Sequence, residues 1–257
     1  MRTTNSLLPP AGLSIFRKHS PTRFCFALLA WALLANPARA EVVYWADWIN
    51  GDVGRANVDG TAIQTIAVAT NFAAGVMIDE STQKVYWAEN GRLVGSIQRS
   101  NLDGSNRETF LGGLENPAAV AIEPSSGRVY WASGPQVDKV QIYSAALDGS
   151  DVKLLASNLG GISGFAFDSA NGKLYWADQA RRTIVVANLD GTSPTTILDN
   201  LDSPIGLGLD AFGRMYWVSY TNWTVLRANV DGSNLETIVS AQPYPAGVMV
   251  DSLNSFV

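Results

Sequence analysis

Short segments in which apolar residues alternate with small ones recur along the chain and predict β-strands. In the segment 75–79, Val76 and Ile78 fall on one face of the predicted strand, and Gly75 begins the other face. Alternation over two residues is typical of a half-buried strand. Four further segments repeat this pattern, at 119–123, 164–168, 206–210 and 247–251.

Two dipeptides recur at almost the same interval as these strands. Tyr-Trp begins at residues 44, 86, 130, 175 and 216, and Asp-Gly begins at residues 59, 103, 148, 190 and 231. Because Gly tolerates positive φ, each Asp-Gly pair predicts a tight hairpin turn. A repeat of about 43 residues that contains several strands is typical of the blades of a β-propeller.

Each repeat is interpreted as four short antiparallel strands. The alternating strand is placed innermost, because its small residues suit a position where blades crowd around an axis. The Tyr-Trp strand comes second, a third strand leads to the Asp-Gly turn, and a short fourth strand follows. Since every strand type occurs five times, the sequence predicts an all-β propeller of five four-stranded blades.

The two ends of the chain are predicted to complete one blade together. The region after residue 40 begins with a Tyr-Trp strand, and the innermost-type segment 247–251 is followed only by SLNSFV. Written end to start, DSLNSFV and EVVYWAD resemble the internal segment 168–178, DSANGKLYWAD. Pairing of the N- and C-terminal strands would close the ring and hide its edges. The alternative is a six-bladed fold that lacks one blade, left open or paired in a dimer.

The motifs YWAD, YWAE and ANLDG resemble the YWTD repeat, also called the low-density lipoprotein receptor class B repeat. The resemblance covers essentially all of residues 41–257, and it implies a β-propeller that acts as an extracellular binding module, usually without catalysis. Propellers of that family usually have six blades, whereas this sequence contains five repeats. The acid of the motif is kept at Asp47, Glu89 and Asp178 but is replaced by Ser133 and Ser219.

Residues 1–40 are predicted to be a signal peptide. Residues 24–35 form an unbroken apolar run, which suits a signal-peptide core but is shorter than the roughly 20 residues of a membrane span. Basic residues precede this run, and Ala38 and Ala40 form a small-x-small cleavage site. We therefore predict cleavage after Ala40, a propeller domain at 41–257, and a secreted or periplasmic protein without a membrane span. The alternative is that the run is a buried helix of the fold.

Composition limits the chemistry of the predicted mature region. The chain holds 18 basic and 23 acidic residues, and five of the basic residues, Cys25 and His19 all precede residue 41. The remainder has a net charge of −10 and cannot form a disulfide, a Cys/His zinc site or a Ser-His-Asp triad. This charge also argues against nucleic acid as a partner, because neutralising phosphates requires Lys and Arg.

Candidate ligand-binding residues lie in the loops between second and third strands, which share one face of the predicted propeller with the connections between blades. The Tyr-Trp and Asp-Gly pairs recur in every repeat and are interpreted as structural, whereas these loops differ between repeats. Aromatic residues beside polar ones are typical of binding surfaces. The alternative is that the aromatic residues pack over the blade edges. The candidates are Asp47, Trp48, Asn50, Glu89, Asn90, Arg92, Asp178, Arg181, Tyr220, Asn222 and Trp223.

The acids that end the five innermost strands allow two interpretations. By symmetry they are expected to form a ring near the opposite mouth of the channel, where Ca²⁺ or Mg²⁺ would find oxygen ligands. We favour the other interpretation, that each acid accepts backbone N–H bonds in the turn that follows it. No metal or cofactor is therefore assigned. The five acids are Asp79, Glu123, Asp168, Asp210 and Asp251.

Two functions fit these observations. The first is a monomeric, non-catalytic binding module whose partner is a protein, peptide or glycan, with a basic ligand favoured by the acidic surface. The second is a hydrolase that uses paired carboxylates, as in glycosidases, or a lactonase-like metal site. Since no single-copy acid interrupts the innermost strands, we favour binding, expect no enzymatic activity and assign no catalytic residue.

Overall fold

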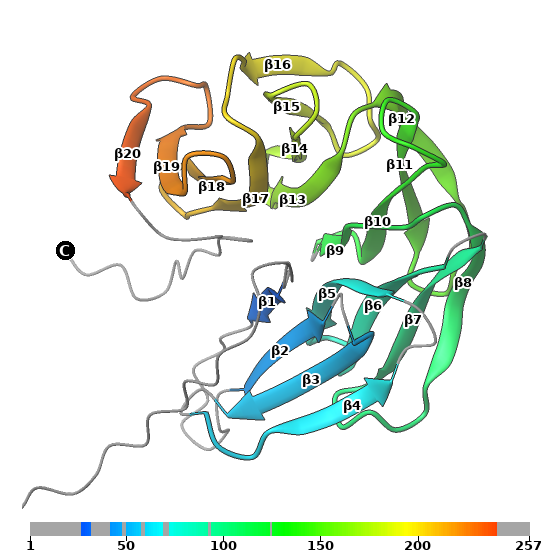
Figure 1. The fold of residues 1–257 in the computed structure, drawn as a ribbon. Helices are drawn as coiled ribbons and strands as arrows, with labels where there is room; N and C mark the ends of the chain where they lie inside the picture. Colours follow the sequence, from blue (N-terminus) through cyan, green and yellow to red (C-terminus); the bar gives the residue numbers. More distant parts are fainter. Residues whose placement is uncertain are drawn as a thin grey trace, which may run out of the picture.

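The structure is a computed structural model that describes residues 27–31, 42–47, 50–57, 60–68, 72–91, 94–123 and 125–240. These residues form five antiparallel sheets of four strands, arranged as blades around a common axis (Figure 1). The one helix in this part of the chain is a 3-10 turn, η1 (Ser169–Asn171). The prediction of an all-β propeller with five four-stranded blades is confirmed.

Each blade takes four consecutive strands, counted from the axis outward. Blade 1 contains β1 (Ala27–Trp31), β2 (Val42–Asp47), β3 (Asp52–Asn57) and β4 (Gln64–Val68). Blade 2 contains β5 (Phe72–Asp79), β6 (Lys84–Asn90), β7 (Gly95–Asn101) and β8 (Glu108–Leu114). Blade 3 contains β9 (Val120–Glu123), β10 (Arg128–Ser133), β11 (Val140–Ala146) and β12 (Lys153–Leu159).

The two remaining blades follow the same order. Blade 4 contains β13 (Ile162–Asp168), β14 (Lys173–Asp178), β15 (Thr183–Asn188) and β16 (Thr195–Leu198). Blade 5 contains β17 (Pro204–Leu209), β18 (Arg214–Ser219), β19 (Thr224–Asn229) and β20 (Glu236–Val239). The fourth strand of blades 1 to 4 leads directly into the innermost strand of the next blade, so the chain travels once around the axis.

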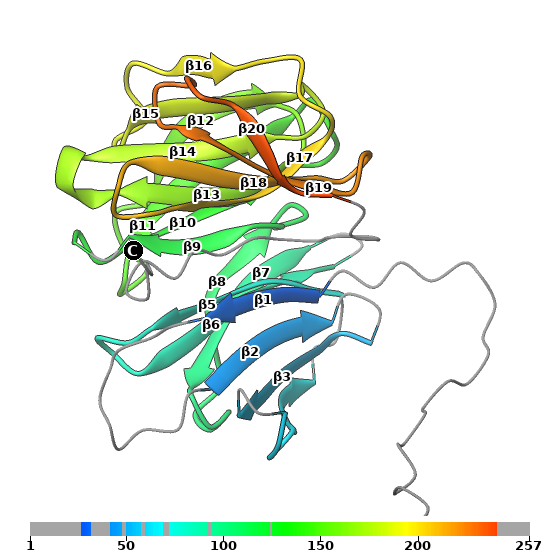
Figure 2. The ribbon, with the colours of Figure 1, turned by 90° about the vertical axis from the view of Figure 1, so that its left-hand side faces the viewer.

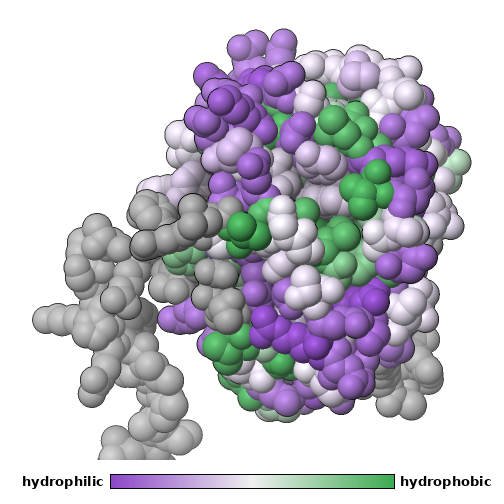
Figure 3. Space-filling view, turned by 90° about the vertical axis from the view of Figure 1, so that its right-hand side faces the viewer, coloured by the Kyte–Doolittle hydropathy of each residue, from purple (hydrophilic) through white to green (hydrophobic). Residues whose placement is uncertain are grey.

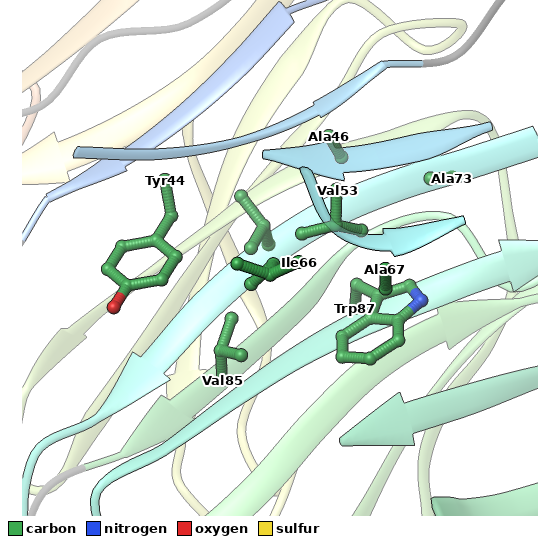
Figure 4. Packing of buried hydrophobic residues seen from close by; sticks show 9 residues of the cluster. Tyr44, Ala46, Val53, Ile66, Ala67, Ala73, Val85 and Trp87 are labelled. Atoms are coloured by element: carbon green, nitrogen blue, oxygen red, sulfur yellow. The ribbon is translucent and has the colours of Figure 1, made fainter. Parts of the chain in front are cut away.

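In blades 2 to 4 the Tyr-Trp pair joins the blade to both of its neighbours, because successive residues of a strand point to opposite faces. Figure 4 shows the cluster between blades 1 and 2, in which Tyr44 and Ile66 of blade 1 pack with Val85 and Trp87 of blade 2. The same arrangement pairs a Tyr with the Trp of the next blade at three more interfaces, between Tyr86 and Trp131, Tyr130 and Trp176, and Tyr175 and Trp217.

Hydrogen bonds to the turn of the next blade reinforce this packing. Tyr44 donates its hydroxyl to the carbonyl oxygen of Leu102 at 3.0 Å, and Arg55 donates to the same oxygen at 2.9 Å. Tyr130 repeats the first contact on the carbonyl oxygen of Leu189 at 3.0 Å. The Tyr side chains therefore satisfy carbonyl groups that the turns of the neighbouring sheet leave unpaired.

The Asp-Gly turns differ in detail from a two-residue hairpin. In blade 2, Gly104 donates its N–H to the carbonyl of Asn101, and Asn101 donates to Ser105, so three residues form the loop. Gly104 has a φ of +86°, and Asp103 accepts hydrogen bonds from the N–H and hydroxyl of Ser105. This is the three-residue hairpin in which only the Gly occupies the left-handed region.

The same Gly also permits close contact between blades. A Cβ atom added at Gly104 would lie 2.4 Å from the carbonyl oxygen of Ile66 in the preceding blade. Gly191 and Gly232 approach Leu155 and Ile197 equally closely. The Asp-Gly pair is therefore structural for two reasons, turn conformation and the space available between sheets.

The prediction for ring closure needs a correction. We predicted that 247–251 lies beside the Tyr-Trp strand of blade 1, but β1 occupies that position, with Leu29 opposite Trp45, Ala30 opposite Tyr44 and Trp31 opposite Val43. The apolar run assigned to the signal peptide can pair here because an edge strand accepts any extended segment that supplies backbone donors and acceptors. Residues 247–251 lie outside the described residues, and cleavage after Ala40 stays a prediction.

The innermost strand of blade 1 is thus the only part of residues 1–40 that the structure describes. No helix in the described part of the chain has the length and apolarity that crossing a bilayer requires.

We expect Gly104→Ala to destabilise the protein more than Gly172→Ala. Both positions have positive φ, but a Cβ at Gly172 meets no atom within 4 Å. In both variants, placing alanine in the left-handed region costs about 1–2 kcal/mol. Only Gly104→Ala also forces two blades apart. Urea midpoints of the two variants measure the difference, and equal midpoints would contradict the contact between blades 1 and 2.

Candidate functional site

The face that carries the candidate residues is called here the upper face. It consists of the loops that join second and third strands and of the connections between blades; the lower face carries the Asp-Gly turns. Figure 2 shows the blades from the side, with their strands running between the two faces. Trp48 and Arg92 lie outside the described residues.

The carboxylate of Asp178, the motif acid of blade 4, is fully engaged in bonds that hold segments of the upper face together. Its side chain is 1% exposed, and its carboxylate accepts hydrogen bonds from the N–H groups of Gly160 at 2.9 Å and Arg181 at 3.0 Å. The Arg181 guanidinium forms an ion pair with the same carboxylate at 3.0 Å and remains 40% exposed. Asp178 therefore links its own loop to the preceding connection, and a ligand would meet Arg181 instead.

Glu89 has the same role in blade 2, with a different partner. Its buried carboxylate accepts the indole N–H of Trp87 at 3.0 Å and forms an ion pair with Arg107. Arg107 also donates to the carbonyl of Val68 in blade 1 at 2.7 Å, and its guanidinium lies 5.4 Å from the Trp87 ring. These contacts bind blades 1 and 2 to each other. Asn90 follows as a half-buried residue at the end of β6.

The two serines at the motif position make the equivalent connection as hydrogen-bond donors. Ser133 donates to the carbonyl of Glu115, and Ser219 donates to the carbonyl of Asp202 at 2.8 Å. In blade 1, Asp47 accepts the backbone N–H of Asn50 at 3.0 Å and its side-chain amide at 2.7 Å. The motif residue thus stabilises the upper face in every blade, either by bonds within its own loop, as for Asp47, or by bonds to another segment, as for Glu89 and Ser133.

Blades 4 and 5 bring the remaining candidates together. Asn222 donates its side-chain amide to Asp202, which also forms an ion pair with Arg182 at 3.1 Å. The backbone N–H of Tyr220 bonds to the carbonyl of Ser203, and Gln179 donates to the hydroxyl of Ser203 at 3.0 Å. We call this group the blade 4–5 patch; its members are Gln179, Arg181, Arg182, Asn200, Asp202, Ser203, Tyr220, Asn222 and Trp223.

The backbone of this patch is strained. Arg182, Asn200, Ser203 and Trp223 all have φ between +48° and +62°. Trp223 is also 40% exposed. Positive φ recurs in other connections of the upper face, at Asn116 and Asn158. Trp223 differs because a bulky residue occupies the left-handed region there, at a cost in free energy that the surrounding structure must offset.

Sequence reasoning missed Arg182, Asn200 and Asp202. Asp202 lies in the connection 199–203 between blades 4 and 5. The sequence feature that could have pointed to it is that this connection lies on the same face as the loop 178–182. Repeat comparison cannot detect it, because the connections between blades have no shared motif.

The acids of the innermost strands hold the turns of the lower face, as the favoured interpretation predicted. Asp79 accepts hydrogen bonds from Ser81 and Thr82, and Asp168 accepts from Asn171. Asp210 accepts the N–H groups of Phe212 and Arg214, both at 2.9 Å. Asp251 lies outside the described residues. In the part of the chain that the structure describes, no three acids, His or Cys gather as a metal site.

Glu123 is the most buried of these acids and joins blades 3 and 4. It is 0% exposed and accepts the N–H groups of Ser125 and Ser126 and the hydroxyl of Ser169 in blade 4. Burial alone would raise the pKa of Glu123, but the bonds from Ser126, Ser169 and Ser125 outweigh it and lower the pKa from 4.5 to about 2. The carboxylate is therefore ionised at neutral pH.

Comparison with known proteins identifies the fold and no family. No family model matches the chain, and no curated protein matches it. Nidogen, solved in complex with laminin, is 22% identical with a TM-score of 0.73, over 86% of this chain and 82% of that one. A gluconolactonase from Xanthomonas campestris is 20% identical with a TM-score of 0.70, over 85% and 77%. A luciferin-regenerating enzyme is 12% identical with a TM-score of 0.64, over 79% and 72%.

These similarities support the β-propeller part of the resemblance noted from sequence. They also correct one expectation: we expected no enzymatic activity, but a gluconolactonase is built on this fold. The sequence argument failed because it inferred function from regular repeats, and one architecture supports both binding and catalysis.

We expect Arg107→Ala to lower the free energy of unfolding by about 1–3 kcal/mol, because it leaves the buried Glu89 carboxylate without its charged partner. The double variant Arg107→Ala with Glu89→Gln should recover part of that loss, as a double-mutant cycle by urea unfolding can measure. Strictly additive losses would show that the two residues do not interact.

The depressed pKa of Glu123 predicts acid sensitivity. Its contribution to stability is fully present above the unfolded pKa of 4.5 and is lost as pH falls toward about 2. Glu123→Gln should therefore destabilise the protein at pH 7 by up to about 3 kcal/mol. The difference from the original protein should shrink below pH 4, as thermal midpoints across this range would show. A constant difference would contradict the assigned hydrogen bonds.

Proposed function

We propose that the protein is an exported propeller of the YWTD type that recognises a protein, peptide or glycan through the blade 4–5 patch. The carrying observation is Trp223, a large aromatic side chain that is 40% exposed while its backbone is held at a φ of +56°. Trp contributes more than most residues to binding when it is buried by a partner. Its strained backbone is retained beside polar groups that could fix a ligand's orientation.

The neighbouring side chains support recognition of a polar partner. Arg181 exposes its guanidinium although it is paired with Asp178, and Asn222 is exposed above Asp202. Because Asp202 and Arg182 are bonded to each other and to the connection, the patch is organised before a ligand arrives. Preorganisation reduces the entropy lost on binding.

The comparisons support a partner-binding role in one respect. Nidogen was solved in a complex with laminin, so this fold does present surfaces to another protein. The predicted signal peptide supports an exported location, and the acidic composition of the region after residue 40 supports a ligand that carries some positive charge.

The test applies the full chain to arrays of glycans and of basic peptides. We expect Trp223→Ala to weaken binding of the best probe at least about tenfold, as for a residue that dominates an interface. Phe212→Ala is the matched control, because Phe212 is an exposed aromatic residue, 66% accessible, in a turn of the lower face. Equal losses in the two variants would contradict a site at the blade 4–5 patch.

The same preparations are assayed for hydrolysis of glucono-δ-lactone, since a solved gluconolactonase shares the fold. Hydrolysis that survives Trp223→Ala, without any array binding, would replace the proposed function with a catalytic one.

A further inference from the structure

The blade 4–5 patch combines one exposed aromatic ring with many polar groups. Apart from Tyr220 and Trp223, each of its members carries an amide, hydroxyl, carboxylate or guanidinium group. Trp223 is 40% exposed, whereas Tyr220 is half-buried. A protein interface of ordinary size buries about 800 Å² on each partner around an apolar core. The patch therefore suits a smaller ligand that is itself mostly polar.

The rim of the propeller carries apolar residues of a different kind. Figure 3 shows the side of the ring that holds β8 and β12, where hydrophobic residues lie in small groups separated by hydrophilic ones. Val152 and Leu154 are each 53% exposed in this part of blade 3. Scattered apolar residues are normal on a protein surface, and only a continuous patch marks a docking site. This side of the rim therefore does not compete with the upper face as a binding surface.

The charges of the patch are paired with one another. Arg181 forms an ion pair with Asp178 at 3.0 Å, and Arg182 forms one with Asp202 at 3.1 Å. A cationic ligand group would have to compete with Arg182 for Asp202. An anionic group would have to compete with Asp178 or Asp202 for a guanidinium. Because a charge that leaves water must find an opposite charge at its binding site, the patch favours a ligand without charge.

The paired side chains still offer hydrogen bonds to a ligand. Arg181 reaches Asp178 through Nη1, and its guanidinium has several further N–H donors. Asn222 is exposed and gives a hydrogen of its amide to Asp202, which leaves a second hydrogen and the carbonyl oxygen for a ligand. A hydroxyl group both donates and accepts hydrogen bonds. A ligand with several hydroxyl groups therefore matches this mixture of donors and acceptors.

Trp223 supplies an apolar contact beside these polar groups. Its loop is held on the way to the ring, because Asn222 donates its backbone N–H to the Ser219 hydroxyl at 3.3 Å and Tyr220 donates to the carbonyl of Ser203 at 3.2 Å. A pyranose ring has a face of C–H groups and a periphery of hydroxyl groups. Such a face stacks on an indole ring through dispersion and burial of apolar area, while the hydroxyl groups remain available to neighbouring polar side chains.

We propose that the ligand of the blade 4–5 patch is an uncharged glycan, with a pyranose ring stacked on Trp223. Its hydroxyl groups bond to Asn222, Arg181 and Arg182. This inference rests on the proposed function and narrows its protein, peptide or glycan to one class. The negative charge of the region after residue 40 is screened beyond about 8–10 Å at physiological ionic strength. It therefore affects how fast charged molecules approach more than which ligand the patch selects.

Salt dependence distinguishes an uncharged glycan from a basic peptide. The test measures dissociation constants of the full chain for neutral hexose and pentose oligosaccharides and for Lys-rich peptides, at about 50 and 500 mM NaCl. We expect an oligosaccharide to bind with a Kd that changes less than about twofold between these conditions, because no ion pair forms with the ligand. Asp199, an exposed acid in the connection 199–203, provides the matched variant. Asp199→Asn should leave the Kd of the oligosaccharide unchanged and weaken binding of a basic peptide.

Two substitutions at Trp223 separate stacking from general apolar contact. Trp223→Phe keeps a flat aromatic ring and should weaken oligosaccharide binding by no more than about threefold. Trp223→Leu keeps apolar volume without a flat face and should weaken it at least about tenfold. Both variants place a side chain at the same positive φ, so the cost to the backbone is matched. Thermal midpoints of the two variants check that folding is equally affected.

The outcomes that overturn this inference differ in what they mean for the proposed function. If no oligosaccharide binds but a peptide does, and that binding depends on Trp223, the glycan is wrong and the patch remains the binding site. Equal losses in Trp223→Phe and Trp223→Leu would contradict stacking and overturn the pyranose assignment alone. Oligosaccharide binding that is unchanged in Trp223→Leu, or the absence of Trp223-dependent binding for every probe, would overturn the inference and the proposed function together.

Discussion

The close approach of neighbouring blades is the constraint on which the rest of the structure depends. No disulfide is available to the residues after 40, so the sheets must be held by packing and hydrogen bonds. The Tyr-Trp pairs of blades 2 to 4 each contribute to two interfaces. The Asp-Gly turns of blades 2, 4 and 5 allow backbone to pass where a side chain would not fit, as at Gly104 against Ile66. Burying one such aromatic side chain stabilises the fold by roughly 1.5–3 kcal/mol, and the repeat does so at the four interfaces that join blade 1 through to blade 5.

This constraint also determines which residues remain for function. Polar side chains that look like ligand-binding groups in sequence, such as Glu89 and Asp178, are required to join a loop to the adjacent blade, and Glu123 serves the lower face in the same way. The residues left to meet a partner are those whose loops vary, above all Trp223 and Arg181. A regular scaffold with a few irregular surface positions is how a repeat protein separates stability from recognition.

The same physics explains why one blade interface differs from the others. A propeller buries its first and last sheets only if some segment completes the ring, and an uncovered edge strand pairs with whatever extended chain is within reach. In this protein β1 covers the inner edge of β2, and Trp45 and Tyr216 stay half-buried. Fold similarity to nidogen and to a gluconolactonase shows how widely the architecture is used; the chemistry at the surface is particular to each chain.

Local spacing in the sequence was sufficient for the five blades, the strand order and the structural role of Tyr-Trp, because each of these follows from a repeated pattern of apolar residues and turns. The sequence was also sufficient to predict that acids such as Asp79 and Asp168 accept hydrogen bonds from the turns that follow them. Tertiary structure alone decided that Glu89 pairs with Arg107, that Asp202 joins Arg182 to Asn222, and that β1 lies beside β2. These are contacts between repeats or between an unrepeated segment and the sheet, and periodicity within a repeat carries no information about them.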